Sequence, residues 1–286
     1  MKALTTILTT VMLGFGLAAC SINVDGLNAK RVKASENYVT KEIRVSDFDK
    51  INLIGSGNVY FTQQPGAPAV SVVTSDNVAE ILDVYVENNT LCLRIKKGYS
   101  VNYLKKLDYT VNAAALKAMN ITGSGDFKLM NGLTTDNLKL SITGSGDMDC
   151  NNVNCSGNME VSISGSGDIN ADNLQSNELS VSIAGSGDIG LGNISANNVK
   201  ANISGSGDIK LKGKTLKAKY SIAGSGDIEA DNLLAEDVTA NAAGSGEITC
   251  FASSSIKASR SGSGSIGYKG NPSTVDVSKK GVYTIQ

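Results

Sequence analysis

The chain has 286 residues, and 26 Lys and Arg stand against 27 Asp and Glu, so its charges nearly balance. This balance argues against nucleic acid as a partner, because such proteins carry a basic surface. Histidine is absent, which removes His-based catalytic triads, His metal sites and the usual proton shuttle. Tryptophan is also absent and aromatic residues make up 5% of the chain, so most stacking platforms for sugars or bases are missing.

Residues 1–19 have the features of a bacterial export signal. Lys2 precedes a mostly apolar stretch over 4–17, which is too short for a permanent membrane span. Two alanines and Cys20 follow, and this ending resembles a lipoprotein lipobox. The resemblance implies cleavage before Cys20 and a lipid on its sulfur; the alternative is an ordinary secretory peptide with an unrelated Cys. Ser21, rather than Asp, favours the outer membrane by analogy with sorting in enteric bacteria, so we expect a lipid-anchored envelope protein.

Residues 20–40 are polar and are predicted to form a tether. This tether carries a basic cluster at Lys30, Arg31 and Lys33, which either is simply solvated or lies near anionic head groups.

Residues 41–115 alternate apolar and polar positions without the regular repeat that follows. They are predicted to be an irregular β-rich first half or cap of a solenoid, with at most a short helix at 77–82. The irregular stretch 96–110 departs from the repeat, so its tyrosines are candidate ligand-binding residues. These are Tyr99, Tyr103 and Tyr109.

Residues 116–286 are built on a repeated turn, Gly-Ser-Gly-Asp followed by an apolar residue. Eight copies follow one another at intervals of 18 to 21 residues, and the last two have an altered sequence. Their first glycines are Gly123, Gly144, Gly165, Gly185, Gly205, Gly224, Gly244 and Gly262. A near-constant period of this length is typical of stacked-repeat proteins.

Apolar and polar positions alternate around each turn, which is the pattern of β-strands. Counted from the first glycine, even positions are apolar or Gly, and odd positions are mostly Ser, Thr or Asp. One such coil cannot bury its inner face alone, whereas stacked coils can. The sequence therefore predicts an all-β fold, a right-handed parallel β-helix with coils of about 20 residues. A flatter β-roll is the alternative.

Stacking places equivalent residues of successive coils about 4.8 Å apart, in columns. The third position after each first glycine forms an acidic column: Asp126, Asp147, Asp168, Asp188, Asp208, Asp227 and Glu247. The eighth position forms an Asn column: Asn131, Asn152, Asn173, Asn193 and Asn232, with Gly213 interrupting it. Turn and ladder chemistry explains both columns.

Calcium is the alternative interpretation of the acidic column, because calcium prefers six to eight oxygen ligands. Its candidate ligands are Asp147, Asp168, Asp188, Asp208 and Asp227. We expect no other cofactor.

Three further features concern single positions. Lys210 and Lys212 are expected beside Glu229 and Asp231 of the next coil. Residues 151–158 are expected to form a loop that departs from the repeat. The cysteines after Cys20 are expected to be buried, small and apolar in role.

The assembled pattern resembles the family of bacterial exported proteins named "putative autotransporter adhesin, head GIN domain". The resemblance is carried by the lipobox, the segments 47–51 and 89–93, the serial turns and the closing segment 268–272. It covers roughly residues 40–286. It implies a β-helical extracytoplasmic protein with an adhesive role, and it brings no catalytic motif.

Three functions are open on the sequence, and non-enzymatic binding is favoured. A long flat face of Ser and Asp would present hydroxyls and carboxylates at fixed spacing to a glycan or a surface protein. The lipid anchor would attach the protein to the membrane. A pectate-lyase-like polysaccharide enzyme is the first alternative, but it needs an irregular, convergent set of Asp with Arg or Lys, and these Asp are periodic. A purely structural envelope protein is the second.

Overall fold

The computed structural model describes residues 29–278 and 280–285. Cys20, the predicted signal peptide and the first part of the predicted tether lie outside the described residues. Within the described part of the chain, no helix combines the length and the apolar character needed to cross a membrane.

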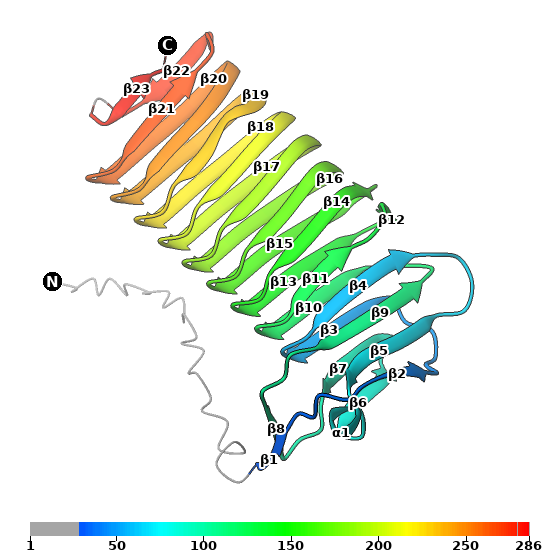
Figure 1. The fold of residues 1–286 in the computed structure, drawn as a ribbon. Helices are drawn as coiled ribbons and strands as arrows, with labels where there is room; N and C mark the ends of the chain where they lie inside the picture. The colour runs from blue at the N-terminus through cyan, green and yellow to red at the C-terminus, as the bar shows by residue number, and fades with distance from the viewer. Residues whose placement is uncertain (1–28, 279, 286) are drawn as a thin grey trace, which may run out of the picture.

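Most of the chain forms a stack of parallel coils, which runs from the N-terminal strands to the C-terminus at the opposite end (Figure 1). Successive coils pair in register, so that Ile183 lies beside Ile203 and Gly185 beside Gly205. The solenoid makes about 8 turns and confirms the predicted fold. Its strands are β10 (Ala118–Gly123), β11 (Asp126–Leu129), β12 (Leu133–Thr135), β13 (Leu138–Gly144), β14 (Met148–Cys155), β15 (Asn158–Gly165), β16 (Ile169–Gly185), β17 (Ile189–Gly205), β18 (Ile209–Gly224), β19 (Ile228–Gly244) and β20 (Glu247–Gly262).

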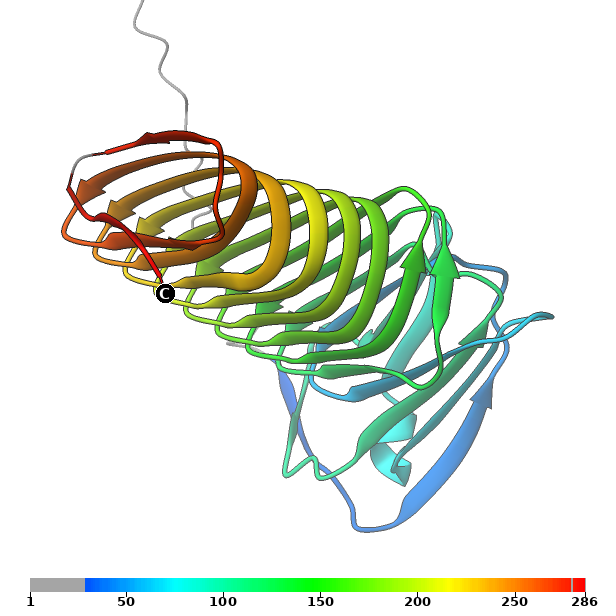
Figure 2. The same cartoon turned by 90° about the horizontal axis from the view of Figure 1, so that it is seen from above.

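Each regular coil has three sides. Along β16, buried and exposed residues alternate except at 172–173 and 177–178, where two exposed residues follow one another. Because side chains of a straight strand alternate, these two slips mark corners, and the Gly-Ser-Gly-Asp turn is the third corner. We call 169–171, 174–176 and 179–185, with their equivalents in other coils, the first, second and third sides. Figure 2 shows the coils as stacked loops.

The core fills the inside of the stack. Ile163, Ile183 and Ile203 of the third side form a column with 2% or less of each residue exposed. Tyr220 is fully buried in the neighbouring column, where it lies between Ala201 and Ala240 of the adjacent coils. A large side chain between two small ones keeps the interior filled. Cysteines 92, 150, 155 and 250 are buried and not bonded to one another.

The repeated glycines let the coils approach at the turn. Gly205 has a φ of +143°, and a Cβ there would lie 2.1 Å from the carbonyl oxygen of Gly185. A Cβ at Gly207 would lie 2.0 Å from the oxygen of Gly187. Only glycine fits both positions, because the turns of neighbouring coils stack backbone on backbone.

The N-terminal strands extend the stack. β3 (Lys50–Gly55) and β4 (Asn58–Gln63) pair with β10 and β11, so an additional Gly-Ser-Gly turn lies directly before the regular repeats. β7 (Thr90–Ile95) and β9 (Leu107–Ala113) pair in parallel with β3 and β4 on the other side. β2 (Tyr38–Ile43), β5 (Ala69–Ser75) and β6 (Leu82–Glu87) then pair antiparallel, and α1 (Asp76–Ala79) joins β5 to β6.

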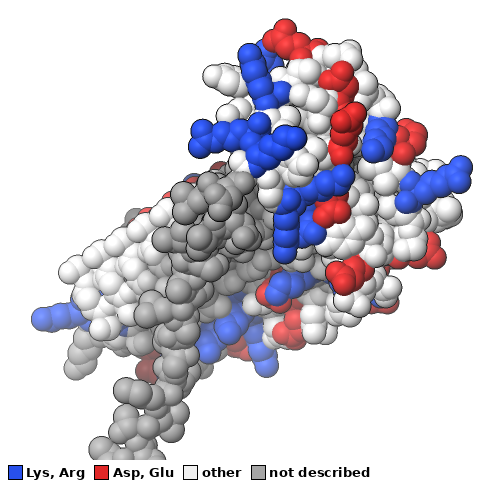
Figure 3. All heavy atoms as spheres, turned by 90° about the horizontal axis from the view of Figure 1, so that it is seen from below, with Lys and Arg blue, Asp and Glu red and all other residues white. Residues whose placement is uncertain are grey.

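A separate two-stranded sheet lies where the described chain begins. β1 (Lys30–Lys33) pairs in parallel with β8 (Tyr99–Asn102). The segment predicted as a tether therefore contains a strand and the start of β2. Charged side chains gather over this end of the molecule (Figure 3). At the opposite end the chain closes with β21 (Ser265–Lys269), β22 (Thr274–Val277) and β23 (Val282–Thr284).

Two local predictions require correction. Residues 151–158 do not form a loop: 151–155 belong to β14, and Asn152 to Asn154 pair in register with Asn173 to Gln175 of β16. Lys210 does pair with Glu229, at 3.2 Å, but Lys212 does not reach Asp231. A register shift places Lys212 beside Asn232, and Asp231 contacts Lys269 at 2.7 Å instead.

Candidate functional site

The acidic column forms a ladder along the turn. At each step, the backbone N–H of one acidic residue donates to Oδ1 of the Asp one coil earlier, over 2.7–3.1 Å from Asp126 to Glu247. Hydrogen bonds to a carboxylate stabilise its charged form, which offsets repulsion between neighbours. One oxygen of each predicted calcium ligand is thus committed to the turn. No group of three or more His, Cys, Asp or Glu in the described residues could hold a metal ion, and calcium binding stays a prediction.

The ladder predicts that the oxygen of Asp188, rather than its charge, stabilises the turn. In the unaltered protein the N–H of Asp208 donates to Oδ1 of Asp188 over 2.8 Å. Asp188→Ala removes this acceptor and should lower the free energy of unfolding by about 1 kcal/mol. Asp188→Asn keeps an oxygen acceptor and should lower it by less than half as much. Urea unfolding of the three proteins measures both values. Equal losses in the two variants would contradict the ladder.

The Asn column forms its own ladder in part. The Asn173 amide donates to Asn152 over 2.7 Å, and the Asn193 amide donates to Asn173 over 2.8 Å. At the other corner, the Asn197 amide donates to Asn177 over 2.7 Å, a second ladder that sequence analysis missed. These amide ladders fix the two corners that flank the second side.

The three candidate tyrosines do not form one site. Tyr109 is fully buried in β9, burial raises the pKa of its hydroxyl, and that hydroxyl has no hydrogen-bond partner. This corrects the prediction that Tyr109 contacts a ligand. The alternation with buried Leu107 and Val111 was the signal for its burial. Tyr99 and Tyr103 lie at the surface of the β1–β8 sheet.

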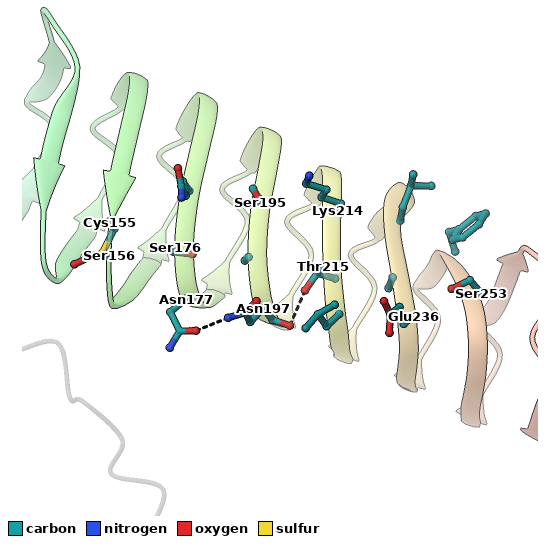
Figure 4. A pocket seen from close by; sticks show the side chains of 16 residues that line it. Cys155, Ser156, Ser176, Asn177, Ser195, Asn197, Lys214, Thr215, Glu236 and Ser253 are labelled. Atoms are coloured by element: carbon teal, nitrogen blue, oxygen red, sulfur yellow. Dashed lines mark hydrogen bonds between the residues drawn. The ribbon is translucent and has the colours of Figure 1, made fainter.

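A groove of about 770 Å³ runs along the second side and the corner beside it, which we call the second-side groove. Its lining residues line up coil by coil (Figure 4). The outward residues of the second side are Gln175, Ser195, Lys214, Leu234 and Phe251, and the corner residues are Asn177, Asn197, Leu216 and Glu236. The groove is therefore built from repeated positions of six successive coils.

The groove changes character along its length. Ser and Asn side chains line the coils nearer the N-terminus, whereas Leu216 and Leu234 are 48% and 54% exposed nearer the C-terminus. Leu234 lies beside Lys214 on one coil and Phe251 on the next. Sequence analysis missed this patch, although leucines at outward positions, where other coils carry polar residues, were its signal.

The polar side chains of the groove can donate and accept hydrogen bonds. Lys214 and Glu236 are its charged residues, and it contains no arginine. Cys155 is buried beneath it, burial raises the pKa of its thiol, and its Sγ lies 3.4 Å from the Asp136 carbonyl oxygen. A raised thiol pKa disfavours the reactive thiolate. The chemistry at hand is that of a binding groove with polar and apolar portions.

Comparison with known proteins agrees with this architecture. Solved structures similar to this chain include a "putative lipid binding protein" from Parabacteroides distasonis, at 29% identity and a TM-score of 0.67, covering 90% of this chain and 100% of that one. A "putative adhesin" from Parabacteroides merdae matches at 23% identity and a TM-score of 0.68, with the same coverage. A "putative adhesin" from Parabacteroides distasonis matches at 23% and 0.70, covering 89% and 99%.

No curated protein matches the sequence. A family model does match it, over residues 47–191 and 159–272, and these ranges together include the strands β3 to β9, the acidic ladder and the second-side groove. The chain therefore belongs to the family described as "Putative auto-transporter adhesin, head GIN domain".

Proposed function

We propose that the chain is a non-enzymatic adhesin of the bacterial envelope, held in the outer membrane by a lipid on Cys20, that binds an extended glycan along the second-side groove. Membership of the adhesin family supports a place at the bacterial surface or envelope. The lipobox-like sequence before Cys20 supports the anchor.

The observation that carries the glycan proposal is the composition of the groove along the stack. A sugar presents hydroxyls at its edge and C–H groups on its face, so its site needs hydrogen-bonding groups beside an apolar surface. Asn177, Asn197 and Ser195 supply the former, and Leu234 and Phe251 supply the latter. Six coils at about 4.8 Å spacing span about 24 Å, which suits a polymer better than a small molecule.

The Ser/Asp edge is a second candidate surface. Ser186 and the equivalent Ser of the other turns are exposed, beside the acidic ladder. The ladder engages one oxygen of each Asp, and the described turns of this edge lack the large exposed apolar side chains that the groove carries at Leu216 and Leu234. An enzymatic alternative has less support: Arg94 pairs with Asp83 at 2.7 Å on the β6–β7 hairpin, outside the groove.

A tryptophan scan of one coil separates these surfaces. Ser195→Trp fills the groove and should lower polysaccharide binding at least tenfold on an array of soluble bacterial and mucosal polysaccharides. Ser186→Trp places the same bulk on the Ser/Asp edge of the same coil and should leave binding unchanged. Loss in Ser186→Trp alone would move the site to the edge. Failure of the unaltered protein to bind any polysaccharide would overturn the glycan proposal.

A further inference from the structure

Positive charge is concentrated at the N-terminal end of the fold. The segments 29–34 and 96–106 together contain seven Lys and Arg and no acidic residue, on a chain whose net charge is −1. Lys105 pairs with Glu36 at 3.0 Å and Lys106 with Asp108 at 3.8 Å. The other five have no carboxylate within 4.0 Å among the described residues: Lys30, Arg31, Lys33, Lys96 and Lys97.

The β1–β8 sheet brings these cations together with tyrosines. Register places Lys30 beside Tyr99 and Lys33 beside Asn102. The Nζ atoms of Lys30 and Lys33 lie 5.8 Å and 5.7 Å from the ring centroids of Tyr99 and Tyr103. The sheet thus brings together residues about 70 positions apart, which sequence analysis divided between a tether and an irregular stretch.

Tyr103 is displayed rather than packed. It is 75% exposed, the largest exposure among the large hydrophobic residues of the described chain, and its φ is +58°. A non-glycine residue in this backbone region is uncommon, and here it holds an aromatic ring at the surface beside Lys33. Val101 and Leu104, close to it in sequence, pack against the core.

The chain enters the described structure at this surface. Nine residue steps separate Cys20 from Ala29, and an extended chain spans at most about 3.6 Å per residue, or about 30 Å in all. A lipid on Cys20 would therefore keep the bilayer within reach of Lys30 and its neighbours. Tethering of this kind gives a high effective concentration, so a weak surface is sufficient.

We infer that Lys30, Arg31, Lys33, Lys96, Lys97 and Tyr103 form a membrane-docking surface for anionic phospholipid head groups; this rests on the lipid anchor of the proposed function. Lys and Arg are attracted to anionic lipid, and tyrosine prefers the membrane–water interface. The surface lies at the end of the stack, with the C-terminal coil at the other end (Figure 1). Docking would place the N-terminal end of the solenoid against the bilayer. The stack, with the second-side groove, would then extend away from the membrane.

Vesicle sedimentation of the mature chain without its lipid, residues 21–286, tests the surface. Vesicles of phosphatidylcholine with 30 mol% phosphatidylglycerol should bind it, and phosphatidylcholine alone should not. The variant Arg31→Glu/Lys33→Glu/Lys97→Glu should bind at least about 100-fold more weakly, since each basic residue contributes about fivefold. The control Lys212→Glu/Lys217→Glu/Lys219→Glu makes the same charge change on exposed solenoid positions and should lose less than fivefold.

Two results would overturn the inference: no preference of the unaltered chain for anionic vesicles, or equal losses in the two triple variants. Palmitate labelling in cells tests the anchor separately, because Cys20→Ala removes the label while leaving residues 29–285 unchanged. Palmitate uptake without binding to anionic vesicles would support the lipid anchor and contradict the docking surface. Absence of palmitate from the unaltered chain would contradict the lipid anchor itself.

Discussion

Replacing Gly207 by Ala is expected to destabilise the protein by about 3 kcal/mol or more. The new Cβ would lie 2.0 Å from the carbonyl oxygen of Gly187 and 3.0 Å from its carbonyl carbon. Both atoms are backbone in a paired turn, so neither can rotate away. Relief requires the two coils to separate, which breaks the acidic ladder at Asp208.

Gly132→Ala provides the control for this prediction. A Cβ at Gly132 would lie 3.7 Å from the nearest atom, the Asn152 oxygen, which is ordinary contact. We expect its free energy of unfolding to stay within about 1 kcal/mol of the unaltered protein, or to rise, because alanine reduces the freedom of the unfolded chain. Thermal unfolding should separate the two variants by about 6–12 °C. Similar melting temperatures would show that the turns do not stack as described.

Stability should fall steeply in alkaline solution. Burial raises the pKa of the Cys150 and Cys250 thiols from 9.0 to about 12, and it raises the pKa of the Tyr109 and Tyr220 hydroxyls above 10.0. As pH rises, the unfolded chain loses these protons before the folded chain does. It therefore binds fewer protons, and the free energy of unfolding falls. The stabilisation that comes from keeping these four groups protonated in the core is complete below pH 9. It is lost progressively from pH 9 for the thiols and from pH 10 for the hydroxyls.

The expected slope is large because four groups act together. Each ionising group changes the free energy of unfolding by about 1.4 kcal/mol per pH unit, so the four should remove about 5 kcal/mol between pH 10.5 and 11.5. Tyr220→Phe should flatten the slope by about a quarter. It should also stabilise the protein by about 1 kcal/mol at pH 7, since the buried hydroxyl lacks a partner.

Tyr103→Phe is the matched control, because the Tyr103 ring is exposed. Urea unfolding at intervals from pH 8 to 11.5 gives the slope for each protein. An unchanged slope in Tyr220→Phe would mean that the Tyr220 hydroxyl reaches solvent or a partner in the folded chain.

Features that repeat were predictable from the sequence. The period, the inward Ile columns and the stacking of Asp188 on Asp168 follow from spacing, because equivalent residues of successive coils must meet. The two further corners were missed, since their signal is a slip of one residue in the alternation at 172–173 and 177–178. In a single coil, a break of one residue in the alternation cannot be recognised as a corner. It becomes recognisable only when the sequences of successive coils are aligned.

Features that depend on single positions or distant segments were less accessible. The apolar patch of the groove depends on Leu216 and Leu234, which depart from their columns. The cationic surface needs Lys30 and Lys33 to meet Tyr99 and Tyr103, and pairing across nearly 70 residues leaves no local pattern. Tyr109 is different: its alternation with Leu107 and Val111 indicated a core strand, but the irregular setting suggested exposure.

The turn stacking makes the length of the molecule adjustable. Each coil offers the next the same Gly oxygens and the same Asp oxygen that it receives from the coil before, as at Gly185, Gly205 and Asp188. Duplication or deletion of one repeat would therefore leave both new neighbours matched. It would move the distal end by about 4.8 Å and change nothing in the cross-section. Related chains can thus differ in length by whole coils while keeping the same cross-section.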